Sequence, residues 1–249
     1  MKVKAILVAG GHGNRLFPFT KYTQKTLLPL FERPVIDYAL GTIRRSGIKD
    51  ITIISNQFIG QIAKHVGTGL EDEKIHYVLE ETPSGVAAAL ELARPHNEDC
   101  RLLIYFSDNI TTVELAETVE QYISSESNPG CVLLAREEKN PQAFGVAVMS
   151  DGGKVIDIVE KPTNPPSNLA IGGIYLFDER FWGFFDEGVA EMAEDFSISD
   201  VTRRYVKDGS ATLLTVGEET WVDCGTAESL LQASIMARDG KLNPSPHRE

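Results

Sequence analysis

The chain has 249 residues, of which 42% are hydrophobic and 24% charged, and its formal net charge is −12. This length and composition allow a sizeable core within one α/β domain, and the negative charge argues against nucleic-acid polymers and anionic membranes as partners, because both would be repelled. The three cysteines lie far apart in the sequence without metal-ligand spacing, which argues against disulfides and a zinc site.

The first predicted element is a buried strand over residues 6–9, which runs into a glycine-rich turn. Gly10, Gly11 and Gly13 remove the side chains that would keep a ligand from the backbone N–H groups, a pattern typical of phosphate binding. The stretch departs from two known phosphate-binding patterns. Leu16 stands where the dinucleotide fingerprint needs a third glycine, and no Gly-Lys-Ser/Thr follows the turn.

Two cations follow the glycines. Arg15 offers a planar fork to two phosphate oxygens and Lys25 a mobile point charge, so the pair is suited to hold both ends of a leaving pyrophosphate. The alternative is an ordinary turn in which Arg15 and Lys25 are solvated charges without a function. Judged by the glycines alone, phosphate binding and an ordinary turn are equally favoured.

Beyond the loop, apolar periodicity predicts alternating helices and strands. Helices are expected at 34–47, 57–66 and 86–93, and strands at 50–55, 75–79 and 101–106. Such alternation is typical of a mainly parallel, doubly wound sheet with its ligand crevice at the carboxyl ends of the strands. Asp108 follows the last of these strands, where it either contacts a ligand or caps a helix expected near residue 112.

The pattern changes after a further strand at 131–135. Two alternating runs within 144–162 flank Asp151-Gly152-Gly153, which predicts a hairpin and the start of an antiparallel section. Later elements are expected as strands at 170–177, 211–216 and 221–223, a capped helix at 197–205 and a last helix from residue 226. The aromatic side chains between residues 181 and 185 are expected to belong to the core. Asp223 alone would be interpreted as a cap of the last helix.

Residues 10–29, GGHGNRLFPFTKYTQKTLLP, resemble the signature of the sugar-nucleotide pyrophosphorylases, a family of nucleotidyltransferases, written G-G-x-G-T-R-L followed by P-x-T and K-x-L-L-P. The glucose-1-phosphate thymidylyltransferases are the most similar branch. VEKP at 159–162 and WVDCGT at 221–226 match later family motifs in order, so that the resemblance spans residues 5 to about 234.

The resemblance implies an α/β fold of the nucleotide-diphospho-sugar transferase type, which is a Rossmann-like, doubly wound mixed sheet with a smaller antiparallel sugar-binding section. We expect a single domain over 1–237, with a nucleotide-binding half at 1–135, a sugar-binding half at 136–237 and a polar tail at 238–249. The apolar runs are too short to span a bilayer and the N-terminus leads directly into a strand, so we also expect a cytoplasmic protein.

The implied reaction joins a nucleoside triphosphate and a sugar 1-phosphate into a nucleotide sugar and pyrophosphate, with dTTP, glucose 1-phosphate and Mg²⁺ as the favoured substrates and cofactor. The alternatives are UTP, CTP or GTP, another sugar, or a catalytically silent regulatory subunit that only binds sugar nucleotides. Lys25, Asp108 and Asp223 are all present, which favours the enzyme. The extra C-terminal helices of longer relatives are missing, so their tetramer and allosteric site do not carry over and a homo-oligomer stays open.

The family's roles fall on matching positions of this chain. The resemblance implies catalytic roles for Arg15, Lys25 and Asp108, and Mg²⁺ coordination by Asp108 and Asp223. Nucleotide binding falls on Ala9, Gly10, Gly11, Gly13, Asn14, Arg15, Lys25, Glu80 and Gly85, and sugar-phosphate binding on Asn109, Gly145, Glu160, Lys161, Ile171 and Gly173.

Three positions depart from the family pattern. Asn14 replaces the usual threonine, Glu80 replaces a glutamine that reads the base, and Thr26 replaces a longer polar residue. An ionised glutamate only accepts hydrogen bonds, whereas a glutamine also donates, so these departures indicate relaxed base choice.

Overall fold

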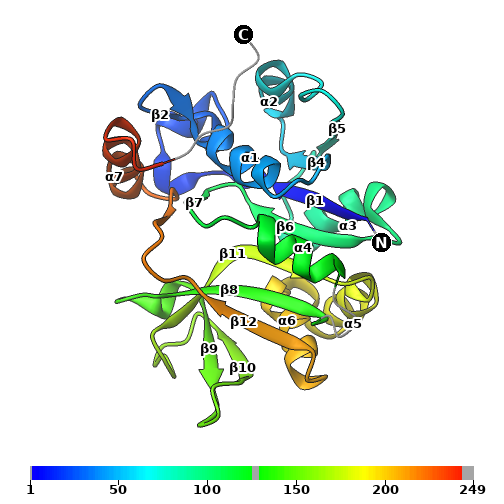
Figure 1. The fold of residues 1–249 in the computed structure, drawn as a ribbon. Coiled ribbons are helices and arrows are strands. Elements are labelled where there is room, and N and C mark those ends of the chain that lie inside the picture. The colour runs from blue at the N-terminus through cyan, green and yellow to red at the C-terminus, as the bar shows by residue number, and fades with distance from the viewer. Residues whose placement is uncertain (1, 125–128, 243–249) are drawn as a thin grey trace.

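The computed structural model describes residues 2–124 and 129–242 and arranges them around one mixed β-sheet (Figure 1). The first half contributes four parallel strands in the order β5-β4-β1-β6, namely β5 (Lys74–Leu79), β4 (Asp50–Ser55), β1 (Val3–Val8) and β6 (Arg101–Phe106). Their apolar side chains are buried on both faces of β1, β4 and β6, as in parallel sheets covered by helices on either side. This confirms the predicted doubly wound sheet.

The second half extends the same sheet in antiparallel fashion. β11 (Leu169–Phe177) pairs with β6 and connects it to the hairpin of β9 (Gly145–Met149) and β10 (Val155–Glu160). β8 (Cys131–Glu137) is antiparallel to β11 and parallel to β12 (Ala211–Thr215). The antiparallel pairing therefore begins with β8, before the expected position at 144, because the partner of β8 lies far along the chain where local periodicity carries no signal.

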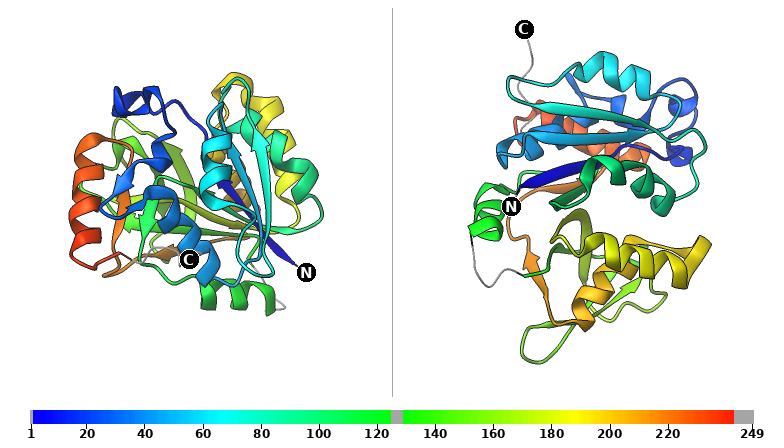
Figure 2. Two further views of the ribbon diagram at one scale, coloured as in Figure 1. Left: turned by 90° about the horizontal axis from the view of Figure 1, so that it is seen from above. Right: turned by 90° about the vertical axis from the view of Figure 1, so that its right-hand side faces the viewer.

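Helices cover both faces of the sheet, as the two apolar clusters show. One face packs against α1 (Val35–Arg45), α2 (Ile59–Val66) and α4 (Ala116–Ser124). The other packs against α3 (Val86–Asn97), α5 (Phe181–Met192) and α6 (Ile198–Lys207), which lie together in Figure 2. Phe181, Trp182 and Phe185 of α5 are buried in that cluster, which confirms their prediction as core.

Two helix boundaries differ from the sequence expectation. α3 continues past Pro95 to Asn97, because Asn97 is fully buried and its side-chain amide donates to Thr52 Oγ1 at 3.0 Å. α4 begins at Ala116 rather than near residue 112, since the chain leaves β7 (Asn109–Thr111) only at Thr111 and the Thr112 N–H still donates to the Thr220 carbonyl at 3.0 Å.

A small outer layer packs beside the first half of the chain. α7 (Ala227–Arg238) packs on β2 (Pro29–Leu30) and shares an apolar cluster with Leu30, and β2 pairs with β3 (Arg33–Pro34). Short 3₁₀ helices are η1 (Asn14–Leu16), η2 (Phe19–Lys21), η3 (Lys25–Leu27), η4 (Pro141–Ala143) and η5 (Ala193–Asp195). Residues 243–249 of the expected tail lie outside the described residues, and in the described chain no helix combines the length and apolarity needed to cross a membrane.

Candidate active site

The glycine turn after β1 forms one wall of a cavity of about 330 Å³ at the carboxyl ends of the parallel strands. The cavity is lined by Val8, Gly10, Gly11, His12, Lys25, Glu80, Pro83, Gly85, Val86, Ala89, Phe106 and Asp108. Gly11 and Gly13 adopt φ values of 83° and 62°, which side chains rarely tolerate. A Cβ at Gly13 would also lie 2.8 Å from Thr20 Cγ2, so the turn can form only with glycine there.

The remaining residues of the turn are held by its neighbours. Ala9 is fully buried, and its carbonyl accepts a hydrogen bond from Ser55 Oγ at 3.0 Å. Asn14 and Arg15 are exposed in η1, directly after Gly13. The predicted phosphate-binding residues are therefore contiguous and open to a ligand.

Lys25 is held by Gln24, a buried glutamine that sequence reasoning missed. The Gln24 side chain is 1% exposed; its Oε1 accepts from the Lys25 backbone N–H at 2.6 Å and its Nε2 donates to Ser55 Oγ at 3.2 Å. The Lys25 ammonium lies 2.5 Å from Asp108 Oδ2, and both side chains are largely buried. Gln24 thereby ties η3 to the end of β4 and places Lys25 against the carboxylate that follows β6.

Asp108 and Asp223 are brought together by a strand pair that sequence reasoning missed. β7 pairs with β13 (Trp221–Asp223) so that Asn109 and Asp223 are register partners, and the Cys224 N–H donates to the Asp108 carbonyl at 2.7 Å. Neither carboxylate caps a helix, since α4 begins well after Asp108 and Thr226 caps α7. The capping interpretation is wrong for both residues.

Arg15 completes this cluster from the glycine loop. A Cβ at Gly225 would lie 2.6 Å from both Arg15 Nη2 and Asp223 Oδ1, so the guanidinium and the carboxylate flank the same glycine. The Gly225 N–H donates to Asp223 Oδ1 at 2.8 Å. Three distant segments of the chain thus contribute charges to one corner of the cavity.

The electrostatics of this corner suit a divalent cation. Burial first, and the neighbouring Asp108 carboxylate second, raise the pKa of Asp223 above 3.8, while the Gly225 N–H, Lys25 and Arg15 oppose the shift. Within residues 2–124 and 129–242, no group of three or more His, Cys, Asp or Glu side chains is close enough to hold a metal ion. Two carboxylates that repel each other fit an ion such as Mg²⁺, which keeps most of its positions for phosphate and water.

Glu80 lines the same cavity as Lys25 and Asp108, next to Gly10 of the glycine turn. Its side chain is 3% exposed, its Oε1 accepts from the Ser84 N–H at 3.2 Å, and its Oε2 would lie 3.0 Å from a Cβ at Gly10. Gly85, with φ 97°, begins α3 beside it. Thr26 is fully buried with no hydrogen-bond partner for its hydroxyl.

In the second half, Gly145, Glu160 and Ser199 meet where the hairpin contacts α6. Ser199 Oγ donates to Glu160 Oε2 at 2.6 Å, and a Cβ at Gly145 would approach both side chains within 3.1–3.2 Å. Lys161 lies 3.4 Å from Glu160 Oε1 but its side chain is 68% exposed. Sequence reasoning missed Ser199, whose only local signal is its place in the first turn of a helix.

The glycines of β11 pack closely against side chains of the β7–β13 strand pair. A Cβ at Gly172 would overlap the Trp221 ring, and one at Gly173 would overlap the Asn109 amide, so each glycine makes room for a protein side chain. Ile171, just before them, is buried with 5% exposure. The polar end of this strand is thus packed against the strand pair that carries Asp223.

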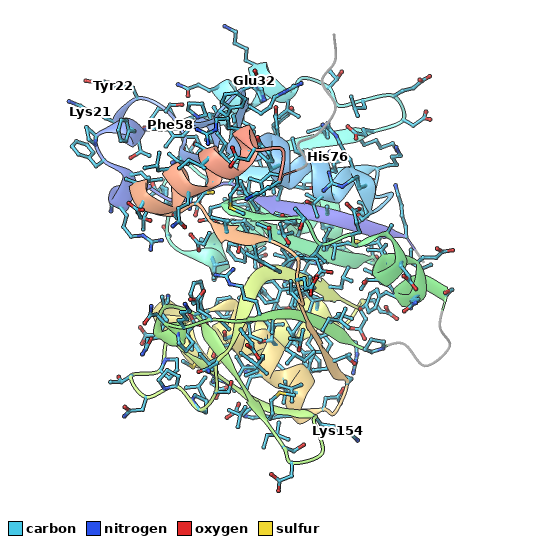
Figure 3. The ribbon with its side chains drawn as sticks, turned by 60° about the vertical axis from the view of Figure 1, so that its left-hand side comes forward. Lys21, Tyr22, Glu32, Phe58, His76 and Lys154 are labelled. Carbon is cyan, nitrogen blue, oxygen red and sulfur yellow. The ribbon has the colours of Figure 1, made fainter. Side chains whose placement is uncertain are left out.

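Two other lysines, Lys21 after the glycine turn and Lys154 in the β9–β10 hairpin, lie apart from the cavity. In Figure 3, Lys21 and Tyr22 point outward from the loop that follows the glycines, while Lys154 lies at the tip of the β9–β10 hairpin at the far end of the molecule. Of the cations between residues 13 and 26, Arg15 and Lys25 are therefore the two that face the carboxylates.

A glycine loop at the strand ends, with an Arg, a Lys and two carboxylates beside it, is chemically suited to a polyanionic ligand. The Nucleotidyl transferase family model matches residues 4–239. The chain belongs to this family.

Relatives and solved structures narrow the class. The chain is 31% identical over 236 residues to a glucose-1-phosphate thymidylyltransferase of Neisseria meningitidis, covering 93% of this chain and 81% of the relative. It is 31% identical over 241 residues to the low-salt glycan biosynthesis nucleotidyltransferase Agl11 of Haloferax volcanii, covering 96% and 67%. A Bacillus anthracis structure described as a glucose-1-phosphate thymidylyltransferase with sucrose matches with a TM-score of 0.88, 32% identity and 98% coverage of both chains.

A UDP-glucose pyrophosphorylase structure matches with a TM-score of 0.82 and 19% identity, covering 96% of this chain and all of that one, a likeness of fold. The protein is thus an enzyme of the sugar-nucleotide nucleotidyltransferase kind, with the predicted nucleotide-diphospho-sugar transferase fold, and it resembles the glucose-1-phosphate thymidylyltransferases.

Proposed function

We propose that this enzyme transfers a thymidylyl group from dTTP to glucose 1-phosphate, giving dTDP-glucose and pyrophosphate. The main support for a nucleotidyl transfer reaction is that Lys25, Asp108 and Asp223 lie together beside the glycine-lined cavity. The choice of dTTP and glucose 1-phosphate is supported by the names of the Neisseria and Bacillus relatives.

In this reaction an oxygen of the sugar phosphate attacks the α-phosphorus of the triphosphate. A new P–O bond forms as the bond from the α-phosphorus to the bridging oxygen breaks, and pyrophosphate leaves with that electron pair. The nucleophile is already an anion, so no general base is required. The protein must bring two polyanions together and stabilise the charge that develops on the bridging oxygen.

We assign phosphate binding and charge stabilisation to the glycine loop and its two cations. Gly10, Gly11 and Gly13 leave N–H groups for the phosphates, Asn14 is available at the same exposed edge, and Arg15 binds the leaving pyrophosphate. Lys25 neutralises the α-phosphate, for which its ammonium is already held at the cavity wall.

Mg²⁺ is the ion that we propose for Asp108 and Asp223. Burial first, and the neighbouring Asp108 carboxylate second, raise the pKa of Asp223, and a divalent cation would relieve the repulsion between the two carboxylates. When bound, the ion supplies further positive charge to the phosphate oxygens in the reaction.

The base lies, in this proposal, between the glycine turn and Gly85, beside Glu80. The ionised carboxylate of Glu80 accepts the N3–H of thymine but faces the O4 lone pairs unless it is protonated. The amino groups of cytosine and guanine would offer it a donor, so transfer from CTP or GTP is the second candidate, favoured by this one side chain.

The sugar phosphate occupies the second half, residues 136–237, in this proposal. Glu160, oriented by Ser199, accepts hydrogen bonds from sugar hydroxyls beside Gly145, and Lys161 approaches the phosphate. We assign Asn109 of β7, and Ile171 and Gly173 of β11, to binding of the same substrate. The triphosphate belongs to residues 1–135, and we propose the cytoplasm, where nucleoside triphosphates are made, as the location.

A substrate grid tests the proposal. Pyrophosphate release is measured with dTTP, UTP, CTP and GTP, each paired with glucose 1-phosphate and with other sugar 1-phosphates, in the presence of Mg²⁺. We expect the highest kcat/KM with dTTP and glucose 1-phosphate. A higher kcat/KM with CTP or GTP would overturn the base assignment, and nucleotide binding without any turnover would overturn the transfer reaction.

A further inference from the structure

The indole of Trp221 is fixed from three directions, although neither the sequence motifs nor the proposed reaction gives it a task. Its ring lies against the Cα of Gly172, where any side chain would overlap it. The guanidinium of Arg136 lies over the ring at 5.8 Å from the centroid. Its Nε1–H donates to Asn109 Oδ1 at 2.9 Å. The indole therefore presents its single donor to one chosen acceptor.

The acceptor is the side-chain amide of Asn109, and the Trp221 N–H determines how this amide is oriented. A side-chain amide has an oxygen end and an NH₂ end that exchange by a half-turn, so its surroundings must distinguish them. Asn109 Oδ1 receives a second hydrogen bond from the Gly173 N–H at 3.3 Å. With two donors on the oxygen, the NH₂ group is turned to the other side, where it donates to the Phe106 carbonyl at 3.2 Å.

The same NH₂ group donates to Asp108 Oδ1 at 3.1 Å, while Asp108 Oδ2 lies 2.5 Å from the Lys25 ammonium. Both oxygens of this carboxylate are therefore held, one by Lys25 and the other by an amide that Trp221 orients. Asn109 itself is 6% exposed. A half-turn of its amide would put the oxygen of Asn109 against the Asp108 carboxylate and repel it.

We propose that Trp221 is a positioning residue for nucleotidyl transfer, which acts through the Asn109 amide to set the orientation of the Asp108 carboxylate. This inference rests on the proposed function for its catalytic consequence, but its geometric part concerns only residues of this chain.

A matched control exists because the chain has two tryptophans. Trp182 also donates a 2.9 Å hydrogen bond from its Nε1, to the Asn97 carbonyl, inside the core around α5. Trp182→Phe and Trp221→Phe therefore remove the same indole N–H and a similar volume. A residue that only fills space would give the two variants the same behaviour.

We expect Trp221→Phe to lower kcat about tenfold with less than about a threefold change in either KM, because a misplaced catalytic group affects the reaction more than binding. Binding of Mn²⁺ alone, followed by electron paramagnetic resonance, should weaken about tenfold, as is usual when the support of a ligand is lost. Trp182→Phe should keep kcat and Mn²⁺ affinity near wild type, even if its Tm is lower. Equal effects of the two variants, or wild-type kcat and Mn²⁺ binding in Trp221→Phe, would overturn the positioning role.

A second measurement needs neither turnover nor metal. In the metal-free protein, hydrogen–deuterium exchange of the Asn109 side-chain NH₂, followed by NMR, should be at least about tenfold faster in Trp221→Phe than in wild type or Trp182→Phe, as expected of an amide that opens more often. Unchanged exchange would overturn the inference even if the enzyme is active. If wild-type protein releases no pyrophosphate with any substrate pair, the proposed function fails, and this exchange measurement still decides the role of Trp221.

Discussion

The two ends of the active site differ in how far they are built before substrate arrives. At the first end, Lys25, Asp108 and Asp223 come from three distant segments, are largely buried and are already bonded to each other or to backbone N–H groups. At the second end, Glu160 is oriented by Ser199, but Lys161 is 68% exposed. In the proposed function, the groups for phosphoryl chemistry are therefore preorganised, whereas part of the sugar-phosphate contact forms only with the substrate.

The strongest test of the first end is Asp223→Asn. Loss of the charge leaves one carboxylate for the metal, and we expect kcat in Mg²⁺ to fall about 1,000-fold, at the upper end for one transition-state contact. Removing a repelled, buried charge should not lower the Tm of the metal-free protein. Asp151→Asn, at the hairpin tip, is the control and should keep wild-type activity. Near wild-type turnover at limiting Mg²⁺ would exclude the two-carboxylate site.

Lys25→Ala tests the same end through its cation. We expect kcat to fall at least about 100-fold with little change in KM, because the ammonium acts mainly in the transition state. Lys21→Ala removes an outward-pointing lysine of the same loop and should leave kcat unchanged (Figure 3). A change confined to KM would mean that Lys25 only binds substrate.

Glu80→Gln tests whether the buried side chain at position 80 recognises the base. The glutamine oxygen can keep the hydrogen bond from the Ser84 N–H and turn its NH₂ toward the cavity, where it donates to O4 of thymine. We expect the kcat/KM ratio of dTTP over CTP to rise about tenfold, roughly 1.4 kcal/mol. The exposed Glu81→Gln makes the same charge change and should leave the ratio as it was. An unchanged ratio in Glu80→Gln would remove this residue from base recognition.

Lys161→Ala probes the less organised end. An exposed lysine contributes mainly charge attraction, so we expect the KM for the sugar phosphate to rise about fivefold while kcat stays within about twofold. The effect should shrink at high salt, because exposed charges are screened. Lys154→Ala serves as the control on the same hairpin. A large fall in kcat would show that the two ends are equally preorganised.

The smallest effect concerns stability and pH. Burial and the Asp108 carboxylate raise the pKa of Asp223 above 3.8, so the folded protein retains a proton that the unfolded chain has lost. The metal-free protein should therefore lose stability as the pH rises from 3.8 through the raised pKa of Asp223. Asp50 and Glu73, whose pKa values are lowered, contribute with the opposite sign in every variant. Urea unfolding of wild type and Asp223→Asn across pH gives the free energy of unfolding of each protein. The value for wild type minus that for the variant isolates Asp223 and should become more negative as the pH rises.

The sequence predicted the parts of the fold and site that are encoded locally. The glycine turn, the strand before it and the exact span of β6 follow from neighbouring residues, as do the hairpin and the capped helix at Ser197. The residues that support the site could not be predicted, because their partners are distant in sequence. Gln24 is informative only once Ser55 lies beside it, and Trp221 only once β13 has paired with β7.

The pairing of β7 with β13 has a consequence for the making of the protein. Asp108 and β7 are translated well before their strand neighbour β13, which carries Trp221 and Asp223. The parallel sheet and its glycine turn can form earlier, since domains acquire structure as they are synthesised. In the proposed function, a nascent chain that has folded only its first half would hold the glycine turn without Asp223, and transfer would require the later docking of β13 on β7.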